Sequence, residues 1–149
     1  MTEQELKQTL RDRGLRVTPQ RVLIHRALTD LGRHATADEV LAGVEPQLPN
    51  ASLPTVYATL ELLEELGIAH RVAAGTGATL WDPRSQPHHH LVCRSCGTVE
   101  DLDAKVETAA AFRAARRRGF RPDGSELIVT GLCERCQTPS HGPHAAESR

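Results

Sequence analysis

The residues with the clearest chemistry are four cysteines in two closely spaced pairs. Cys93 and Cys96 form one Cys-x-x-Cys pair, and Cys133 and Cys136 form the other. Two intervening residues let both thiolates of a pair reach one ion at about 2.3 Å, and two pairs complete a tetrahedral set of sulfurs. Such a closed site suits structural Zn²⁺, because it leaves no position for a substrate. Because residues 97–132 separate the pairs, the ion would join strands that are distant in the sequence.

A thioredoxin-like redox pair is the alternative interpretation of these cysteines. That chemistry needs only one Cys-x-x-Cys pair at a helix N-terminus. The intervening residues here include neither proline nor glycine. The two pairs therefore favour structural zinc.

Three consecutive histidines precede the first cysteine pair. Because side chains alternate along a strand, His88 and His90 should point to one face and His89 to the other. Two imidazoles on one face begin a metal site, and Asp82 and Asp101 are near enough in the sequence to add carboxylates. The other interpretation is a solvated histidine-rich loop without a ligand.

Capping residues and apolar periodicity predict four helices in the first part of the chain. Residues 4–13 form the first, and Thr18 caps the second, which has Pro19 in its first turn. Thr36 begins the third with a capping box. Ser52 can cap the fourth, which Gly67 ends in a left-handed conformation.

Two short apolar runs follow these helices. Residues 68–73 and 78–81 flank the turn signal at 74–77 and predict a β-hairpin. Helices followed by a hairpin are the order of a winged helix-turn-helix. The fourth helix is then the recognition helix, whose N-terminal turn enters the major groove.

The later part of the chain reads as short strands and one helix. Residues 83–87 contain two prolines and predict a hinge. Beyond it we expect one helix and three strands, and after Cys136 a disordered tail. The helix should span 104–118, the strands 91–93, 99–102 and 127–129, and the tail 138–149.

Composition excludes some classes of protein. No apolar stretch approaches the roughly 20 residues that cross a bilayer, and the polar start MTEQELKQTL has no signal-peptide core. We therefore expect a cytoplasmic protein with no membrane partner. A net charge of −1 does not favour nucleic acid, so DNA binding needs a local basic face. Five arginines and one acid lie between Arg11 and Arg26, although such a stretch is also typical of a solvated surface.

Several of these segments together resemble the ferric uptake regulator family. The resemblance spans about residues 5–137 and implies an α+β fold: an N-terminal winged helix-turn-helix DNA-binding domain at 1–82, a hinge at 83–87, and a C-terminal α/β dimerisation domain with a four-cysteine zinc site at 88–137. The segments that carry it are RVTPQR at 16–21, HATADE at 34–39, PTVYATL at 54–60, HHHLVCRSC at 88–96 and CERC at 133–136.

The resemblance also implies a regulatory metal between the two domains. Its ligands would be His34, Asp82, His88, His90 and Asp101. Imidazole and carboxylate ligands suit Fe²⁺ or Mn²⁺. Aspartate at both carboxylate positions is similar to the peroxide-sensing branch, in which iron and peroxide oxidise a ligand histidine, here His34 or His88, and DNA is released. A regulator of iron or other metal uptake without peroxide sensing is the alternative.

Two further histidine groups give weaker signals. Some family members use a position like His89 in an additional site, together with an acid such as Glu107 and a downstream histidine. Ser125 occupies the place of that histidine, so the set is incomplete. His141 and His144 in the tail receive no role.

The resemblance predicts a homodimer that reads a palindromic DNA operator. Tyr57 can contact a base or phosphate. Ser52 and Thr55 can form hydrogen bonds with phosphate oxygens, and Arg16 and Arg21 would bind the DNA backbone. Core packing is the alternative role for Tyr57. Ala58 stands where the family often has Arg or Asn, which removes a base contact.

Two other functions are compatible with metal ligands. A zinc enzyme needs an open coordination position, a general base and a substrate cleft, but the sequence has no HExxH motif, nucleophile elbow or phosphate loop. An unregulated zinc-ribbon adaptor would not need His34, Asp82 or Asp101. A metal-dependent repressor that is not an enzyme accounts for more of these residues.

Overall fold

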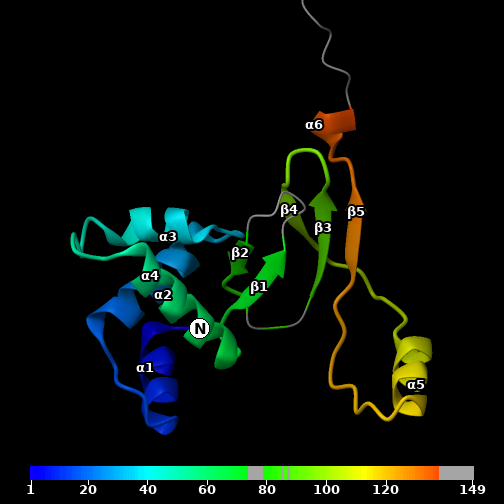
Figure 1. The fold of residues 1–149 in the computed structure, drawn as a ribbon, viewed down its shortest axis with the longest axis horizontal. Coiled ribbons are helices and arrows are strands. Elements are labelled where there is room, and N and C mark those ends of the chain that lie inside the picture. Colours follow the sequence, from blue (N-terminus) through cyan, green and yellow to red (C-terminus); the bar gives the residue numbers. More distant parts are fainter. Residues whose placement is uncertain (74–78, 85, 87, 138–149) are drawn as a thin grey trace, which may run out of the picture.

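Four helices and a two-stranded sheet form the first half of the chain in the computed structural model (Figure 1). The structure describes residues 1–73, 79–84, 86 and 88–137. Strands β1 and β2 are antiparallel, with His70 opposite Asp82, as in a hairpin, whereas the predicted turn at 74–77 lies outside the described residues. The elements are α1 (Glu3–Asp12), α2 (Pro19–Leu31), α3 (Ala37–Val44), α4 (Leu53–Glu65), β1 (His70–Ala73) and β2 (Thr79–Asp82).

The predicted starts of α2 and α3 are confirmed, and a side chain caps the backbone at each. Thr18 Oγ1 accepts the N–H of Arg21 at the start of α2. Thr36 and Glu39 form the expected reciprocal box at α3. Ser52 occupies the N-cap of α4, but its hydroxyl makes no cap bond and instead lies 2.9 Å from Thr55 Oγ1.

An apolar core holds these elements together. Leu28 of α2, Val40 of α3 and Leu60 of α4 are buried, and Trp81 of β2 is buried with them. Burying such side chains contributes about 1.5–3 kcal/mol each. The core therefore fixes α4 relative to β2, at the end of which lies Asp82.

The second half is built on a three-stranded sheet of order β4-β3-β5 (Figure 1). The central strand β3 is antiparallel to β4 and parallel to β5, and α5 lies in the connection between β4 and β5. The elements are β3 (His89–Cys93), β4 (Val99–Leu102), α5 (Ala109–Arg117), β5 (Ile128–Gly131) and the short α6 (Glu134–Gln137).

The predicted helix at 104–118 is too long. In the structure α5 begins at Ala109, after Thr108. The preceding residues include Val106, a weak helix former, whereas the helix begins at a run of alanines. Gly119 follows with φ 84°, which ends the helix as expected.

Some predictions fall partly or wholly outside the described residues. The predicted hinge includes Ser85 and Pro87, which are outside, and so is the tail at 138–149. In the part of the chain that the structure describes, each helix is too short or too polar to cross a membrane.

Candidate metal centres

The four cysteines meet at one end of the three-stranded sheet. Cys93 ends β3, and Gly97, with φ 74°, donates its N–H to the Cys93 carbonyl and turns the first pair back. Cys133 follows β5, and the turn of α6 brings Cys136 back above it. Arg94 N–H donates to Gly131 O at 2.9 Å and ties the two pairs together.

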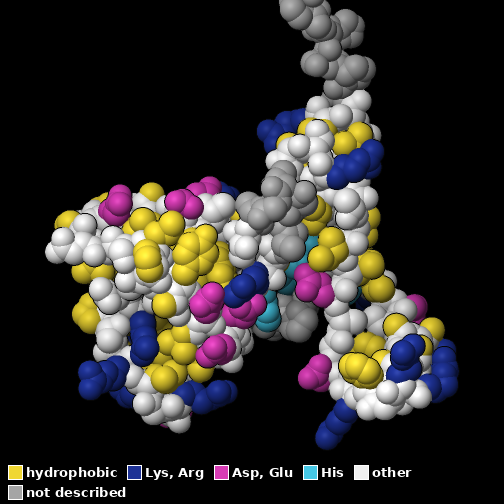
Figure 2. Space-filling view, in the orientation of Figure 1, with side chains coloured by type: hydrophobic (Ala, Val, Ile, Leu, Met, Phe, Trp, Pro, Cys, Tyr) yellow, Lys and Arg dark blue, Asp and Glu magenta, His cyan; other side chains and the backbone are white. Residues whose placement is uncertain are grey.

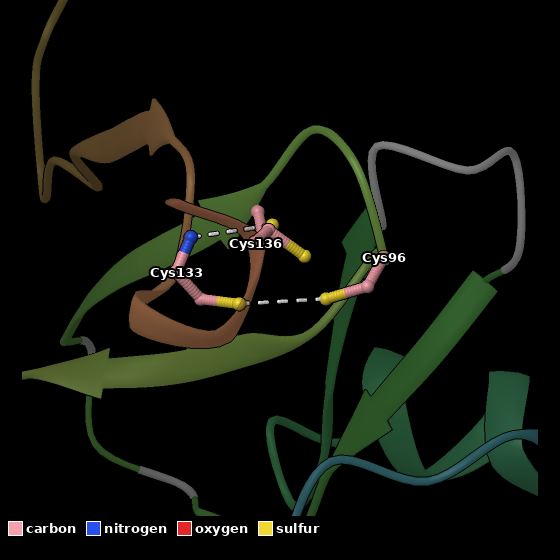
Figure 3. Close-up of side chains that lie close together, drawn as sticks. Cys96, Cys133 and Cys136 are labelled. Atoms are coloured by element: carbon pink, nitrogen blue, oxygen red, sulfur yellow. Dashed lines mark hydrogen bonds between the residues drawn. The ribbon is translucent and has the colours of Figure 1, made fainter. Parts of the chain in front are cut away.

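The four sulfur atoms are spaced for a single zinc ion. They all lie within 4.8 Å of one another, and Figure 3 shows the sulfurs of Cys96 and Cys133 pointing toward each other. Their separation is 3.7 Å, close to the roughly 3.8 Å edge of a tetrahedron with 2.3 Å bonds. All four cysteines are free thiols. One isolated redox pair does not match this arrangement.

The pKa values of the thiols are also consistent with a cation bound among them. The N–H groups of Cys96 and Cys133 point at the Cys93 sulfur and lower the pKa of that thiol to about 5. Ser95 favours ionisation of Cys136, but the neighbouring thiols outweigh it and raise the pKa of Cys136 to about 11. A cation that offsets the charge of the neighbouring thiolates would therefore favour loss of the Cys136 proton at neutral pH.

Backbone pairing brings the second group of polar side chains together. Ala35 and Trp81 form an isolated antiparallel bridge, with N–H···O distances of 3.0 and 2.8 Å. The bridge places the preceding His34 beside Asp82 at the end of β2. On the other side, His90 of β3 lies directly opposite Asp101 of β4.

Five donor atoms converge where these strands meet. The residues are His34, Asp82, His88, His90 and Asp101, and each offers one atom within 4.8 Å of the others. His88 Nε2 is 2.7 Å from Asp82 Oδ2 and 3.2 Å from Asp101 Oδ1, whereas His34 Nε2 is 3.5 Å from both oxygens. In Figure 2, histidine side chains are visible between the two halves of the molecule, with charged side chains around them.

Four of these five donor atoms have no hydrogen bond that could offset their burial. The Nε2 atoms of His34, His88 and His90 and the Oδ2 atom of Asp82 are buried without a hydrogen bond. Leaving a polar atom unpaired costs about 1–3 kcal/mol. A cation held at this point would satisfy all four, so the residues present fit a bound metal.

Electrostatics keep Asp82 ionised at this site. Burial alone would raise the pKa of Asp82, but its contact with His34 and the N–H of Arg84 outweigh burial and lower the pKa to about 2. An ionised carboxylate among imidazoles is a ligand set suited to Fe²⁺ or Mn²⁺.

A family model described as the ferric uptake regulator family matches residues 12–130. The chain belongs to the ferric uptake regulator family. A relative from Staphylococcus aureus, named peroxide-responsive repressor PerR, is 30% identical over 138 residues, which is 91% of this chain and 93% of the relative.

Solved structures share the fold. A zinc uptake regulator solved with zinc and DNA has a TM-score of 0.65 at 26% identity and covers 92% of this chain and 96% of its own. The ferric uptake regulator Fur of Helicobacter pylori, with a TM-score of 0.77 at 17% identity, covers 94% of this chain and 97% of its own. The α+β class expected from the resemblance to the ferric uptake regulator family is confirmed.

This cluster is also contacted by two residues, Glu126 and Arg84, that the sequence patterns did not indicate. Glu126 Oε1 lies 2.8 Å from His90 Nδ1, although 36 positions separate the two residues. Arg84 binds Asp101 through its guanidinium and Asp82 through its backbone N–H, the latter at 2.9 Å. The signal that the sequence held for Glu126 was its position directly before the strand expected at 127–129.

Among the described residues, His89 belongs to neither group of possible metal ligands. Instead, His89 Nδ1 accepts the N–H of Leu127 at 3.2 Å. Glu107 is absent from both groups of possible metal ligands found among the described residues. His141 and His144 lie outside the described residues.

Most of the predicted DNA-contacting residues lie around the start of α4. Arg16, Arg21 and Thr55 line one groove of about 430 Å³ between α4 and the start of α2. Arg21 Nη1 donates to Arg16 O at 2.6 Å, which orders this loop. Tyr57 is 39% exposed and is not part of the buried core. Ser52 is exposed as well but does not line the groove.

Proposed function

We propose that this chain is a metal-dependent transcriptional repressor that binds DNA as a homodimer. One observation carries the proposal: five donor atoms from both halves of the chain converge, and four of them are buried without a hydrogen-bond partner. Residues 1–82 would bind DNA and residues 88–137 would form the dimer. The proposed ligands are Cys93, Cys96, Cys133 and Cys136 for structural Zn²⁺, and His34, Asp82, His88, His90 and Asp101 for regulatory Fe²⁺ or Mn²⁺.

The fold suggests how the regulatory site reaches DNA. His34 lies two residues before Thr36, which caps α3, and α3 packs against α4 through the shared core. A cation shared by His34 and the β3–β4 strands would hold α4 at one angle to the dimerisation sheet. In a dimer, the two α4 helices would then match two half-sites of a palindromic operator.

DNA binding by zinc-loaded protein, with and without Mn²⁺, tests this function. We expect Mn²⁺ to increase affinity for a fragment of the protein's own promoter region, and Asp101→Asn to abolish that increase because it removes a charged donor. Asp103→Asn, which changes an exposed acid two residues away, is the control. Affinity that is the same with and without Mn²⁺ would favour the unregulated adaptor.

A peroxide response is the favoured signal, for two reasons. The relative from Staphylococcus aureus is named peroxide-responsive, and both carboxylates of the cluster are aspartates. Bound Fe²⁺ would activate the O–O bond of peroxide. Overall, the imidazole of His34 or His88 would lose two electrons and gain one peroxide oxygen, and the other oxygen would leave as water. About one equivalent of peroxide should then release DNA and add one oxygen to His34 or His88, as detected by mass spectrometry. Binding that survives peroxide would favour a regulator of metal uptake.

The comparisons disfavour an enzyme. The relatives carry the names of transcriptional regulators, and the four-cysteine group has no free ligand position for a substrate.

A further inference from the structure

Arg84 contacts both carboxylates of the histidine and aspartate cluster. Its backbone N–H donates to Asp82 Oδ1 at 2.9 Å, and its guanidinium donates to Asp101 Oδ2. Asp82 comes from the end of β2 and Asp101 from β4. One residue therefore bridges the two acidic side chains from outside the cluster.

The contacts divide the oxygen atoms of each carboxylate between two roles. Asp82 Oδ2 faces the imidazoles, 2.7 Å from His88 Nε2, and has no hydrogen bond. Asp101 Oδ1 also faces them, 3.2 Å from His88 Nε2. In both residues, the oxygen that Arg84 binds is the one that does not point to the imidazoles.

A carboxylate can bind a cation through one oxygen or through both. We propose that Arg84 is a positioning residue that restricts Asp82 and Asp101 to one donor oxygen each. It thereby sets the affinity and coordination number of the regulatory site. This inference rests on the proposed metal site but assigns a residue that is not itself a ligand.

The positive charge of Arg84 would have the opposite effect on metal affinity. A guanidinium beside the site repels a cation, so its removal could strengthen metal binding. However, the Arg84 side chain is 47% exposed, and water screens charges at such positions, so the repulsion is weak. Outer partners that orient ligands change metal affinity by about 10–100-fold. Positioning therefore outweighs repulsion, and the two effects predict opposite directions.

Direct metal titration of zinc-loaded protein tests the inference without DNA. We expect Arg84→Ala to weaken Mn²⁺ binding by about tenfold or more because Asp101 loses its outer partner. With Co²⁺ as a probe, the visible absorption should weaken as Asp101 becomes free to bind through both oxygens. Arg84→Lys should restore part of the affinity, since an ammonium can bind one oxygen but lacks the guanidinium fork.

Arg26→Ala is the matched control, because Arg26 is 45% exposed and paired with Glu3, away from the cluster. It should leave Mn²⁺ binding unchanged. Zinc content and the thermal midpoint should be the same in all variants. If Arg84→Ala binds Mn²⁺ as tightly as the wild type, or more tightly, positioning by Arg84 is wrong while the metal site stands. If the wild type itself takes up no Mn²⁺ or Co²⁺ beyond zinc, the proposed regulatory site fails as well.

Discussion

At the residue scale, Glu126 contacts the proposed ligand His90 on the side of the imidazole away from the cluster. Its carboxylate lies 2.8 Å from His90 Nδ1, so a proton on Nδ1 would leave Nε2 free to face the cluster. Carboxylates that hold a ligand imidazole in this way contribute about 10–100-fold to metal affinity. We expect Glu126→Ala to weaken Mn²⁺ binding by that order and Glu126→Gln, which keeps an acceptor oxygen, to weaken it less. Titration of zinc-loaded protein measures both, with exposed Glu107→Ala as the control; equal affinities would refute the role.

The proposed ligands could be predicted from the sequence, whereas the residues that orient them could not. His88, His90 and Asp101 lie close together in the chain, and a strand pattern places their side chains. Glu126 reaches His90 only because β5 lies parallel to β3 in one register, with His90 opposite Ile128. In the sequence, Arg84 cannot be distinguished from an ordinary surface cation, because its two partners are brought together only by the positions of β2 and β4 in the structure. Contacts of this kind depend on tertiary register, which short-range patterns do not encode.

At the element scale, the starts of α2 and α3 were predictable from the capping side chains in the sequence. Thr18 and Thr36 fix the starts of α2 and α3, but α5 has no such cap at Thr108 and starts later than predicted. The pairing of the strands was harder to predict from the sequence. Local periodicity indicates that a strand exists but not its partner, so the parallel pairing of β3 with β5 emerges only from the structure.

The cysteine cluster joins β3 to β5, and this makes a prediction about elements. Changing Cys96 to Ser should release zinc, because a neutral hydroxyl is a poor substitute for a thiolate. Hydrogen exchange should then rise in β3 and β5 but not in α2–α4, which have their own core. Exposed Ser125→Ala is the control for zinc content and exchange. A zinc-free variant with unchanged exchange in both strands would show that the cluster has no structural role.

The first turns of α4 carry the predicted contacts with DNA. Tyr57 is exposed on this helix, beside the groove lined by Arg16 and Arg21. We expect Tyr57→Ala to weaken Mn²⁺-activated DNA binding by about 1–3 kcal/mol if the side chain contacts a base. Tyr57→Phe separates loss of the hydroxyl from loss of the ring. Fluorescence anisotropy with the promoter fragment gives the dissociation constants, and wild-type affinity in Tyr57→Ala would exclude this contact.

At the scale of the whole molecule, the part of the chain that the structure describes leaves an apolar edge uncovered. β5 is an edge strand of its sheet, and three successive apolar residues there are exposed by 39%, 44% and 43%: Leu127, Ile128 and Val129. Phe120, in the connection before β5, is 70% exposed. Figure 2 shows hydrophobic side chains on this half of the molecule. Exposed apolar patches beside an unpaired strand edge mark interaction surfaces, and a second copy of this chain would cover this one.

Val129→Lys tests whether this surface forms the dimer. Val129 and Leu91 line a groove of about 360 Å³ next to the cysteines, and a lysine there would bring two charges together across the dimer axis. Because Val129 is already 43% exposed in one chain, the fold and zinc content should persist while sedimentation shows a monomer. DNA affinity should fall steeply, since one recognition helix cannot engage both half-sites. Ala42→Lys, on an exposed position of α3, should remain dimeric. If Val129→Lys also stays a dimer, the two chains meet through another surface and β5 needs a different partner.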